Sequence, residues 1–400
     1  MSVDSSRLPR AMMVDGLLQV VLIFAMSLPM LILYATSTLG PLLSEDLHFD
    51  PAAIGYLIMS SFGLAAVLSL RAGAIVDYIG ARCALLVLFG AIAAAFALIA
   101  AAQVFWSLIA ATAICGIAQA LANPATNLLI AQQVRPEQRA SVVGLKQSGV
   151  QLAALFAGLV LPAVAFQYGW RIAFGVIAPV AIVFGLAALF VTPGQHARGN
   201  KQLTFVRPNA LLSWLMAVQF SVGLALSAFV TFLPTFATQQ DMPLAQADML
   251  IAVFGITGML SRIVLTPLGA KLSDESYLLF TLIAVAAAAI VLTMQAGPES
   301  HWRLWAGAAG MGLSAVATNA IAMSMLIRDS AFGQVAAASS YVSFAFFSGF
   351  ALGPPLFGLL SSQPGGSALG WSVLTSLLCL ACVMTQRLAS ARKRREQASA

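Results

Sequence analysis

The chain has 400 residues, of which only 8% are charged and 60% are hydrophobic, and its mean hydropathy is +0.93. Ordinary soluble domains carry about 25% charged residues, so this chain has too few polar groups to cover a water-facing surface. The composition excludes an ordinary soluble enzyme, a nucleic-acid-binding domain and a disordered scaffold, and it favours an integral membrane protein. The net charge of +6 comes from sparse, segregated basic residues, a pattern of membrane topology rather than of phosphate binding.

Twelve stretches of the sequence are apolar enough to cross a bilayer as helices, each of which takes about 20 residues. Turn and charge signals separate the stretches, for example at residues 40–51, 135–137 and 363–366. We therefore expect an all-α integral membrane protein with 12 transmembrane helices, at residues 14–40, 52–71, 83–102, 105–131, 142–166, 171–191, 210–237, 247–268, 277–296, 303–327, 334–361 and 369–387.

The distribution of lysine and arginine predicts the orientation of these helices, because cytoplasmic loops are enriched in both. If the N-terminus lies in the cytoplasm, sixteen of the 20 basic residues fall in cytoplasmic segments. Only Arg171 and Arg303 fall on the other side, where the loops are acidic, and Lys146 and Arg262 lie within spans. An even number of spans returns the basic tail to the same side. We expect a multi-pass protein of the cell inner (plasma) membrane with both termini cytoplasmic.

The chain divides near its middle. The longest polar stretch between spans is residues 192–209, which predicts a cytoplasmic linker. It separates residues 1–191 from residues 210–400, each of which would form a six-helix bundle, the second ending in a short basic tail. Asp77 follows the second span and Asp274 the eighth, and these positions are 197 residues apart, close to half of the chain. A repeat at this interval is typical of transporters built from two parallel repeats.

The loop after the second span resembles the signature of the major facilitator superfamily, Gly-x-Leu-x-Asp-(Arg/Lys)-x-Gly-(Arg/Lys)-(Arg/Lys). Gly73, Asp77, Gly80 and Arg82 match it, while two of its basic positions are missing; the second copy keeps Asp274 but has lost its glycines. By this resemblance the protein is a prokaryotic-type secondary transporter of two pseudo-symmetric bundles. The resemblance also implies that Gly73, Asp77, Gly80, Arg82 and Asp274 are gating residues, which form a latch that holds the two bundles together at the cytoplasmic side during alternating access. An ordinary turn with a capping aspartate is the simpler alternative.

The same resemblance implies that the first, fourth, seventh and tenth spans line a central cavity. In the fourth span Gln119, Asn123 and Asn127 recur every four residues and therefore share one helix face. Polar side chains are costly in a bilayer and tend to face the protein interior or a water-filled path, although such amides also hold helices together by hydrogen bonds. The candidates for substrate binding are these three amides together with Tyr34, Gln147, Gln151, Gln219 and Asn319.

Two basic residues within spans complete the candidate substrate site. Lys146 lies near the start of the fifth span, where it either faces the substrate path or reaches the cytoplasmic headgroups. Arg262 lies in the eighth span, where the resemblance implies a structural or gating role, and its guanidinium suits a carboxylate. No carboxylate lies deep in any predicted span, and Asp15 lies only at the inner mouth of the first. We therefore expect an organic anion, a mono- or dicarboxylate, to be moved inward, with Asp15 as the candidate for proton coupling.

Catalytic and metal-binding patterns are missing from the sequence. The four cysteines lie in apolar runs, the three histidines lie in loops, and there is no P-loop, His-Glu-x-x-His motif or nucleophile elbow. We expect a monomeric transporter and not an enzyme, with no cofactor, metal or nucleic-acid partner; its partners are the lipid bilayer, a small-molecule substrate and, as an open option, a co-transported proton.

Two other functions remain open at this point. One is proton-coupled efflux of drugs or amphipathic metabolites, although the fifth span lacks the Gly-Pro pair that is typical of drug exporters. The other is a non-transporting membrane sensor, although the tails are too short for a signalling domain.

Overall fold

The computed structural model describes residues 7–192, 207–269, 274–364 and 366–399, and all regular structure in these ranges is helical. Most of the expected linker at 192–209 lies outside the described residues. The helices of the first half are α1 (Arg7–Asp46), η1 (Pro51–Ala53), α2 (Ile54–Ala100), α3 (Phe105–Gln133), α4 (Pro136–Leu159), α5 (Leu161–Tyr168), α6 (Trp170–Gly175) and α7 (Ile177–Val191). Those of the second half are α8 (Ala210–Gln239), α9 (Leu244–Gly269), α10 (Glu275–Met294), α11 (Trp302–Arg328), η2 (Ser330–Phe332), α12 (Val335–Ser361) and α13 (Gly366–Ser399).

Eleven helical segments within the described ranges are long and apolar enough to cross a membrane. The longest, Pro51–Ala100, has 50 residues, whereas one crossing takes about 20. Gly80 breaks this segment with φ 81° and ψ 159°, in the left-handed region that glycine enters without steric cost. The segment therefore counts as two crossings, which gives the expected twelve. The turn is much shorter than the expected loop at 73–82, because Gly80 alone supplies it and the flanking residues are helical.

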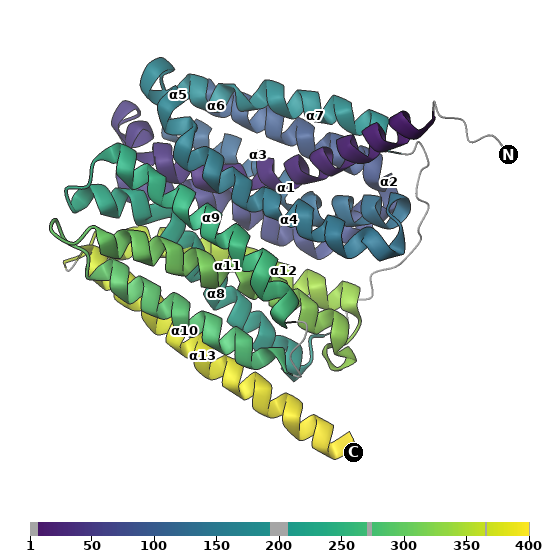
Figure 1. The fold of residues 1–400 in the computed structure, drawn as a ribbon. Coiled ribbons are helices and arrows are strands. Elements are labelled where there is room, and N and C mark those ends of the chain that lie inside the picture. The colour runs from purple at the N-terminus through teal and green to yellow at the C-terminus, as the bar shows by residue number, and fades with distance from the viewer. Residues whose placement is uncertain (1–6, 193–206, 270–273, 365, 400) are drawn as a thin grey trace.

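Both termini lie at one end of the helix bundle, and the helices of the two halves lie on opposite sides of it (Figure 1). We call this end the terminal end; it also holds the two ends of the connection between α7 and α8. The opposite end, which we call the loop end, holds the short turns at residues 47–53, 101–104, 240–243 and 295–301.

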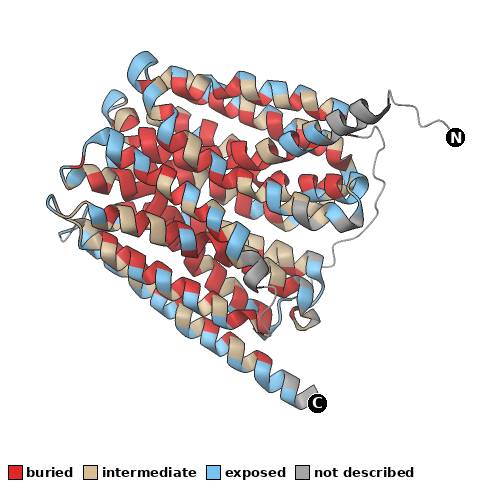
Figure 2. Ribbon diagram, viewed as in Figure 1, coloured by how far each residue is buried: buried red, intermediate tan, exposed pale blue. Residues whose placement is uncertain are grey.

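The outward-facing side chains of the bundle are largely apolar. Exposed positions follow the outer surfaces of the helices, and buried positions fill the interior (Figure 2). Phe166 and Phe190 are 92% and 78% exposed, respectively. Large exposed aromatic side chains of this kind are costly in water and are typical of a surface that contacts lipid. The exterior therefore agrees with a membrane-embedded protein.

The two halves meet through close backbone contacts towards the loop end. Helix α2 packs against α12, α4 against α9, and α1 against α8. A Cβ atom added to Gly55 of α2 would lie 2.6 Å from the backbone of Pro354 and Pro355 in α12. The Ser37 hydroxyl donates a hydrogen bond to the Val230 carbonyl across the same boundary. Small residues at such places let helices approach closely, which stabilises helix pairs in lipid by packing.

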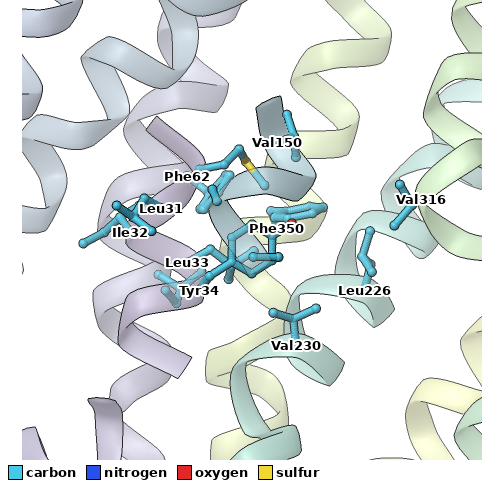
Figure 3. Close-up of a cluster of buried hydrophobic side chains, with 14 of the residues drawn as sticks. Leu31, Ile32, Leu33, Tyr34, Phe62, Val150, Leu226, Val230, Val316 and Phe350 are labelled. Carbon is cyan, nitrogen blue, oxygen red and sulfur yellow. The ribbon is translucent and has the colours of Figure 1, made fainter. Parts of the chain in front are cut away.

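Apolar side chains from both halves fill the middle of this boundary (Figure 3). The ring centroids of Phe62 in α2 and Phe350 in α12 are 4.9 Å apart, and those of Tyr34 in α1 and Phe254 in α9 are 6.2 Å apart. Each pair joins one residue of the first half to one of the second. The described contacts between the halves thus run from the loop end to the centre of the bundle.

Candidate substrate site

Lys146 is the centre of a polar cluster between α3 and α4. Its side chain is 1% exposed, and its ammonium donates hydrogen bonds to Asn127 Oδ1 at 2.6 Å, Thr126 Oγ1 at 2.7 Å and Asn123 Oδ1 at 3.4 Å. The three acceptors lie on one face of α3, as the spacing of the amides predicts. Because the ammonium is buried among them, Lys146 does not reach a headgroup region in this conformation.

Gln147 connects this cluster to the second half of the chain. Its Nε2 donates to Asn123 Oδ1 at 3.1 Å, while its backbone carbonyl and its Oε1 each accept a hydrogen bond of 2.8 Å from Nη1 of Arg262 in α9. One network therefore contains both basic residues that the sequence places within spans. It crosses the boundary between the halves about 10 Å from the terminal end of α9, since Arg262 lies seven residues before Gly269.

Arg262 has unused hydrogen-bonding capacity. Both of its hydrogen bonds start at Nη1, and its buried Nε has no acceptor among the described residues. The Nε and Nη2 edge of a guanidinium is one of those that bind a carboxylate through two parallel hydrogen bonds. Neither Arg262 nor Lys146 forms a salt bridge with a described acidic residue. The network therefore holds two basic side chains without a protein carboxylate to balance them.

The other predicted binding residues surround this network or lie in the second half. Gln151 of α4 lies against Gly258 of α9, one helical turn from Gln147, and the ring of Tyr34 lies 6.2 Å from that of Phe254 in the same helix α9. Gln119 Nε2 contacts the sulfur of Met30 at 3.0 Å. In the second half, Gln219 Nε2 donates to the Thr318 carbonyl at 3.3 Å, beside Asn319. Within the described part of the chain, no hydrogen bond joins these second-half amides to the Lys146 cluster.

Buried polar atoms without a partner gather at these predicted positions. In the described part of the chain, nine buried side-chain nitrogen or oxygen atoms have no hydrogen-bond partner in the protein, and five of them belong to predicted binding residues: Gln119, Gln151, Gln219, Arg262 and Asn319. Such atoms are rare in folded proteins and especially costly in a membrane. The five atoms belong to α3, α4, α8, α9 and α11.

The predicted gating residues behave differently in the two halves. Asp274 caps α10 by accepting from the Ser276 backbone N–H at 2.9 Å, and it forms a salt bridge of 2.7 Å with Arg392 of α13. Arg392 also pairs with Asp329 at 3.1 Å. These partners all belong to the second half, so Asp274 joins helices of one half in this conformation. In the first half Asp77 and Arg82, unlike Asp274, form no ion pair among the described residues.

One acidic residue near the loop end is buried in the structure. Asp248 lies in α9, in the membrane-length segment Leu244–Leu265, and is only 2% exposed. In the sequence this end of the span resembles the acidic outer loops, because burial by a neighbouring helix leaves no mark in a single sequence. The other candidate, Asp15, belongs to α1, but its side chain lies outside the described residues.

The described residues contain no group of three or more histidine, cysteine, aspartate or glutamate side chains that could hold a metal ion. Cys379 and Cys382 are free in the structure. The site is therefore built from amides, hydroxyls and two basic side chains.

Comparison with solved structures identifies the fold. An aspartate-to-alanine mutant of the nucleoside transporter NupG has a TM-score of 0.73 with this chain at 14% sequence identity, and the match covers 93% of this chain and 99% of that one. At this identity the similarity shows the fold alone.

Comparison with curated proteins gives partial matches. They include the hexuronate transporter of Bacillus subtilis (strain 168), 28% identical over 160 residues, which are 38% of this chain and 36% of that protein. The "Probable anion transporter 4, chloroplastic" of Arabidopsis thaliana is 28% identical over 118 residues, 28% of this chain and 22% of that one. The proton myo-inositol cotransporter of Homo sapiens is 28% identical over 178 residues, 42% and 28% of the two chains.

The chain spans about a third or less of the length of these curated relatives. The family itself rests on a longer match, since the sequence profile described as Major Facilitator Superfamily matches residues 18–354. The chain therefore belongs to the major facilitator superfamily: it is a multi-pass secondary transporter of small molecules and not an enzyme.

Proposed function

We propose that this transporter moves a small organic anion, a mono- or dicarboxylate, into the cell by alternating access. The observation that carries the proposal is the central network in which Lys146 and Arg262 are linked through Gln147. A basic side chain held inside a membrane protein without an acidic partner is costly. A carboxylate substrate would supply the missing charge and the acceptors that Arg262 Nε lacks.

The amides of the network add a preference for hydroxyl groups on the substrate. Asn and Gln side chains offer both donors and acceptors, and outside the network Gln151 and Gln119 have buried oxygens without partners. A hydroxylated carboxylate, such as a sugar acid, would use the basic and the amide groups together. The similarity to a hexuronate transporter and to an anion transporter supports this chemistry, although each match is partial.

Alternating access would rock residues 1–191 against residues 210–400, with the linker at 192–209 between them. The described backbone and aromatic contacts between the halves lie at the centre and towards the loop end, and the Gln147–Arg262 hydrogen bonds lie nearer the terminal end. Close backbone packing at the loop end is the arrangement expected when that end is closed. With the basic terminal end in the cytoplasm of a plasma-membrane protein, the conformation would face inward. The substrate would then enter at the loop end and leave at the terminal end.

The experiment that tests the function is uptake by proteoliposomes of purified protein. Labelled monocarboxylates, dicarboxylates and sugar acids would be offered with and without a pH gradient, and empty liposomes would serve as the control. Accumulation of at least one carboxylate, inhibited by excess unlabelled carboxylate but not by myo-inositol, supports the proposal. Absence of uptake for every anion, together with drug resistance in cells that express the protein, would establish efflux instead.

A conservative change of the gating motif tests the proposed cytoplasmic latch. Asp77→Asn should slow exchange of the substrate several-fold and leave its affinity nearly unchanged, because the latch would stabilise the outward-facing state without touching the substrate. In the present conformation Asp77 has no ion-pair partner among the described residues, so the change should not lower the stability of this state. Exchange rates and equilibrium binding in the same preparation provide the measurement, and an exchange rate equal to that of the wild type would remove the latch.

A further inference from the structure

The acidic residue in α9 is unusual for its position. Asp248 is 2% exposed, and its Oδ1 has no hydrogen-bond partner in the protein. It lies near the loop end of the boundary between the halves, where α9 and α4 are in backbone contact. A Cβ atom on Gly158 of α4 would lie 2.8 Å from the Asp248 carbonyl oxygen and 2.5 Å from the Ala252 nitrogen.

The contact between α4 and α9 continues from this point to the substrate network. Gly255 lies against the Gln151 carbonyl, and a Cβ there would be 2.9 Å from it. Arg262 then meets Gln147, as described above. Since α9 rises about 1.5 Å per residue, Asp248 lies about 21 Å from Arg262 along the helix, so it belongs to the closure at the loop end and not to the substrate site.

No basic side chain compensates a negative charge on Asp248 in the described part of the chain. Helix α9 packs against α1, α4, α8 and α11. Asp46 of α1 pairs with Arg171 at 2.7 Å, and Arg303 of α11 stacks on Trp302. Helix α8 has no ionisable side chain, and the ionisable groups with described side chains on the other three helices are Tyr34, Glu45, Asp46, Arg139, Lys146, Arg303 and Arg328.

Among the described residues, the start of α9 is the feature near Asp248 that favours an anion. The partial positive charge of a helix N-terminus acts mainly within the first turn, whereas Asp248 is the fifth residue of α9. Burying an unpaired carboxylate costs far more than burying a neutral carboxylic acid. Burial of this side chain between closed halves therefore favours its protonated form.

We propose that Asp248 is a proton-binding site, and that a proton taken from the solution at the loop end is required for the two halves to close over it. When the halves separate at this end, water reaches the carboxyl group and the proton leaves to the same side. Protonation thus controls closure without carrying a proton across the membrane. This inference rests on the alternating access proposed above but not on the identity of the substrate.

The direction of the pH effect follows from linkage. The closed state binds the proton more tightly than the open state, so the ratio of closed to open molecules rises as the pH falls. A single site changes this ratio by at most about tenfold per pH unit.

Spin labels on opposite halves measure closure without a substrate. Val104 and Trp302 are 57% and 61% exposed, and both lie at the loop end, one in each half. In a background whose four cysteines are replaced by alanine, cysteines introduced at these two positions carry the labels. Distance distributions between pH 5 and pH 9 should show the short, closed distance gaining population at low pH in the otherwise unchanged protein.

Asp248→Asn should keep the short distance at every pH, because asparagine cannot ionise. Glu45→Gln is the matched control, since Glu45 is an exposed acid at the same end, and it should titrate like the parent. If the asparagine variant is polydisperse on size-exclusion chromatography, Asp248→Ser replaces it with the same expectation. A pH-independent distance in the parent, or titration that persists without Asp248, would overturn the proposal. Loss of carboxylate uptake with these distances unchanged would count against the substrate class only.

Discussion

Replacing Arg262 with glutamine should weaken binding of the transported carboxylate by about 10- to 150-fold, since hydrogen bonds to charged groups contribute about 1.5–3 kcal/mol. Glutamine keeps one amide near Gln147 but removes the charge and the Nε and Nη2 edge. Equilibrium binding of the carboxylate identified by uptake, measured by isothermal titration calorimetry in detergent, gives the dissociation constants.

Lys146→Gln should also reduce affinity, because Lys146 carries the other charge of the network. Arg262→Lys distinguishes the effect of the charge from that of the hydrogen-bond geometry. Lysine keeps the positive charge but cannot form two parallel hydrogen bonds with a carboxylate, so we expect a smaller loss of affinity than in Arg262→Gln. Arg387→Gln is the matched control, since Arg387 is an exposed arginine of α13 outside the network. Affinity equal to the wild type in both the Arg262→Gln and Lys146→Gln proteins would make these residues structural.

Gly55→Ala should shift the conformational equilibrium away from the state seen here and slow transport. The added methyl group would lie 2.6 Å from the Pro354 and Pro355 backbone, and backbone cannot move aside as a side chain can. Overpacking of this kind costs about 1–3 kcal/mol, which corresponds to a shift of about 5- to 150-fold in the ratio of closed to open molecules. The labels at Val104 and Trp302 report this ratio directly.

The same substitution elsewhere in α2 provides the control. Gly90 has nothing within 4 Å of an added Cβ, and alanine is the better helix former by about 1 kcal/mol. Gly90→Ala should therefore leave the distances and the transport rate unchanged while stabilising the helix. If Gly55→Ala gives the same distances as Gly90→Ala, the α2–α12 contact does not control closure.

The helical periodicity of the sequence predicted the polar face of α3 but not the contact between Gln147 and Arg262. The four-residue spacing of Gln119, Asn123 and Asn127 put these amides on one face of a helix, and the structure brings Lys146 against two of them. The link from Gln147 to Arg262 could not be predicted, because it joins residues 115 positions apart. Such a pairing depends on how α4 packs against α9, and a helical pattern reports only one helix at a time.

The amino-acid sequence by itself determined that this is a helical membrane protein, because bilayer crossing places a strong and local demand on each segment: a long apolar run with its backbone hydrogen bonds satisfied internally. It also determined that a turn and the family motif follow the second span. Only the tertiary structure decided which polar groups are buried without partners, where the two halves are in contact, and that Asp248 lies beside the contact between α4 and α9. Burial and closure arise from contacts between distant helices through small residues such as Gly55 and Gly158, and these contacts have no periodic signature along the chain.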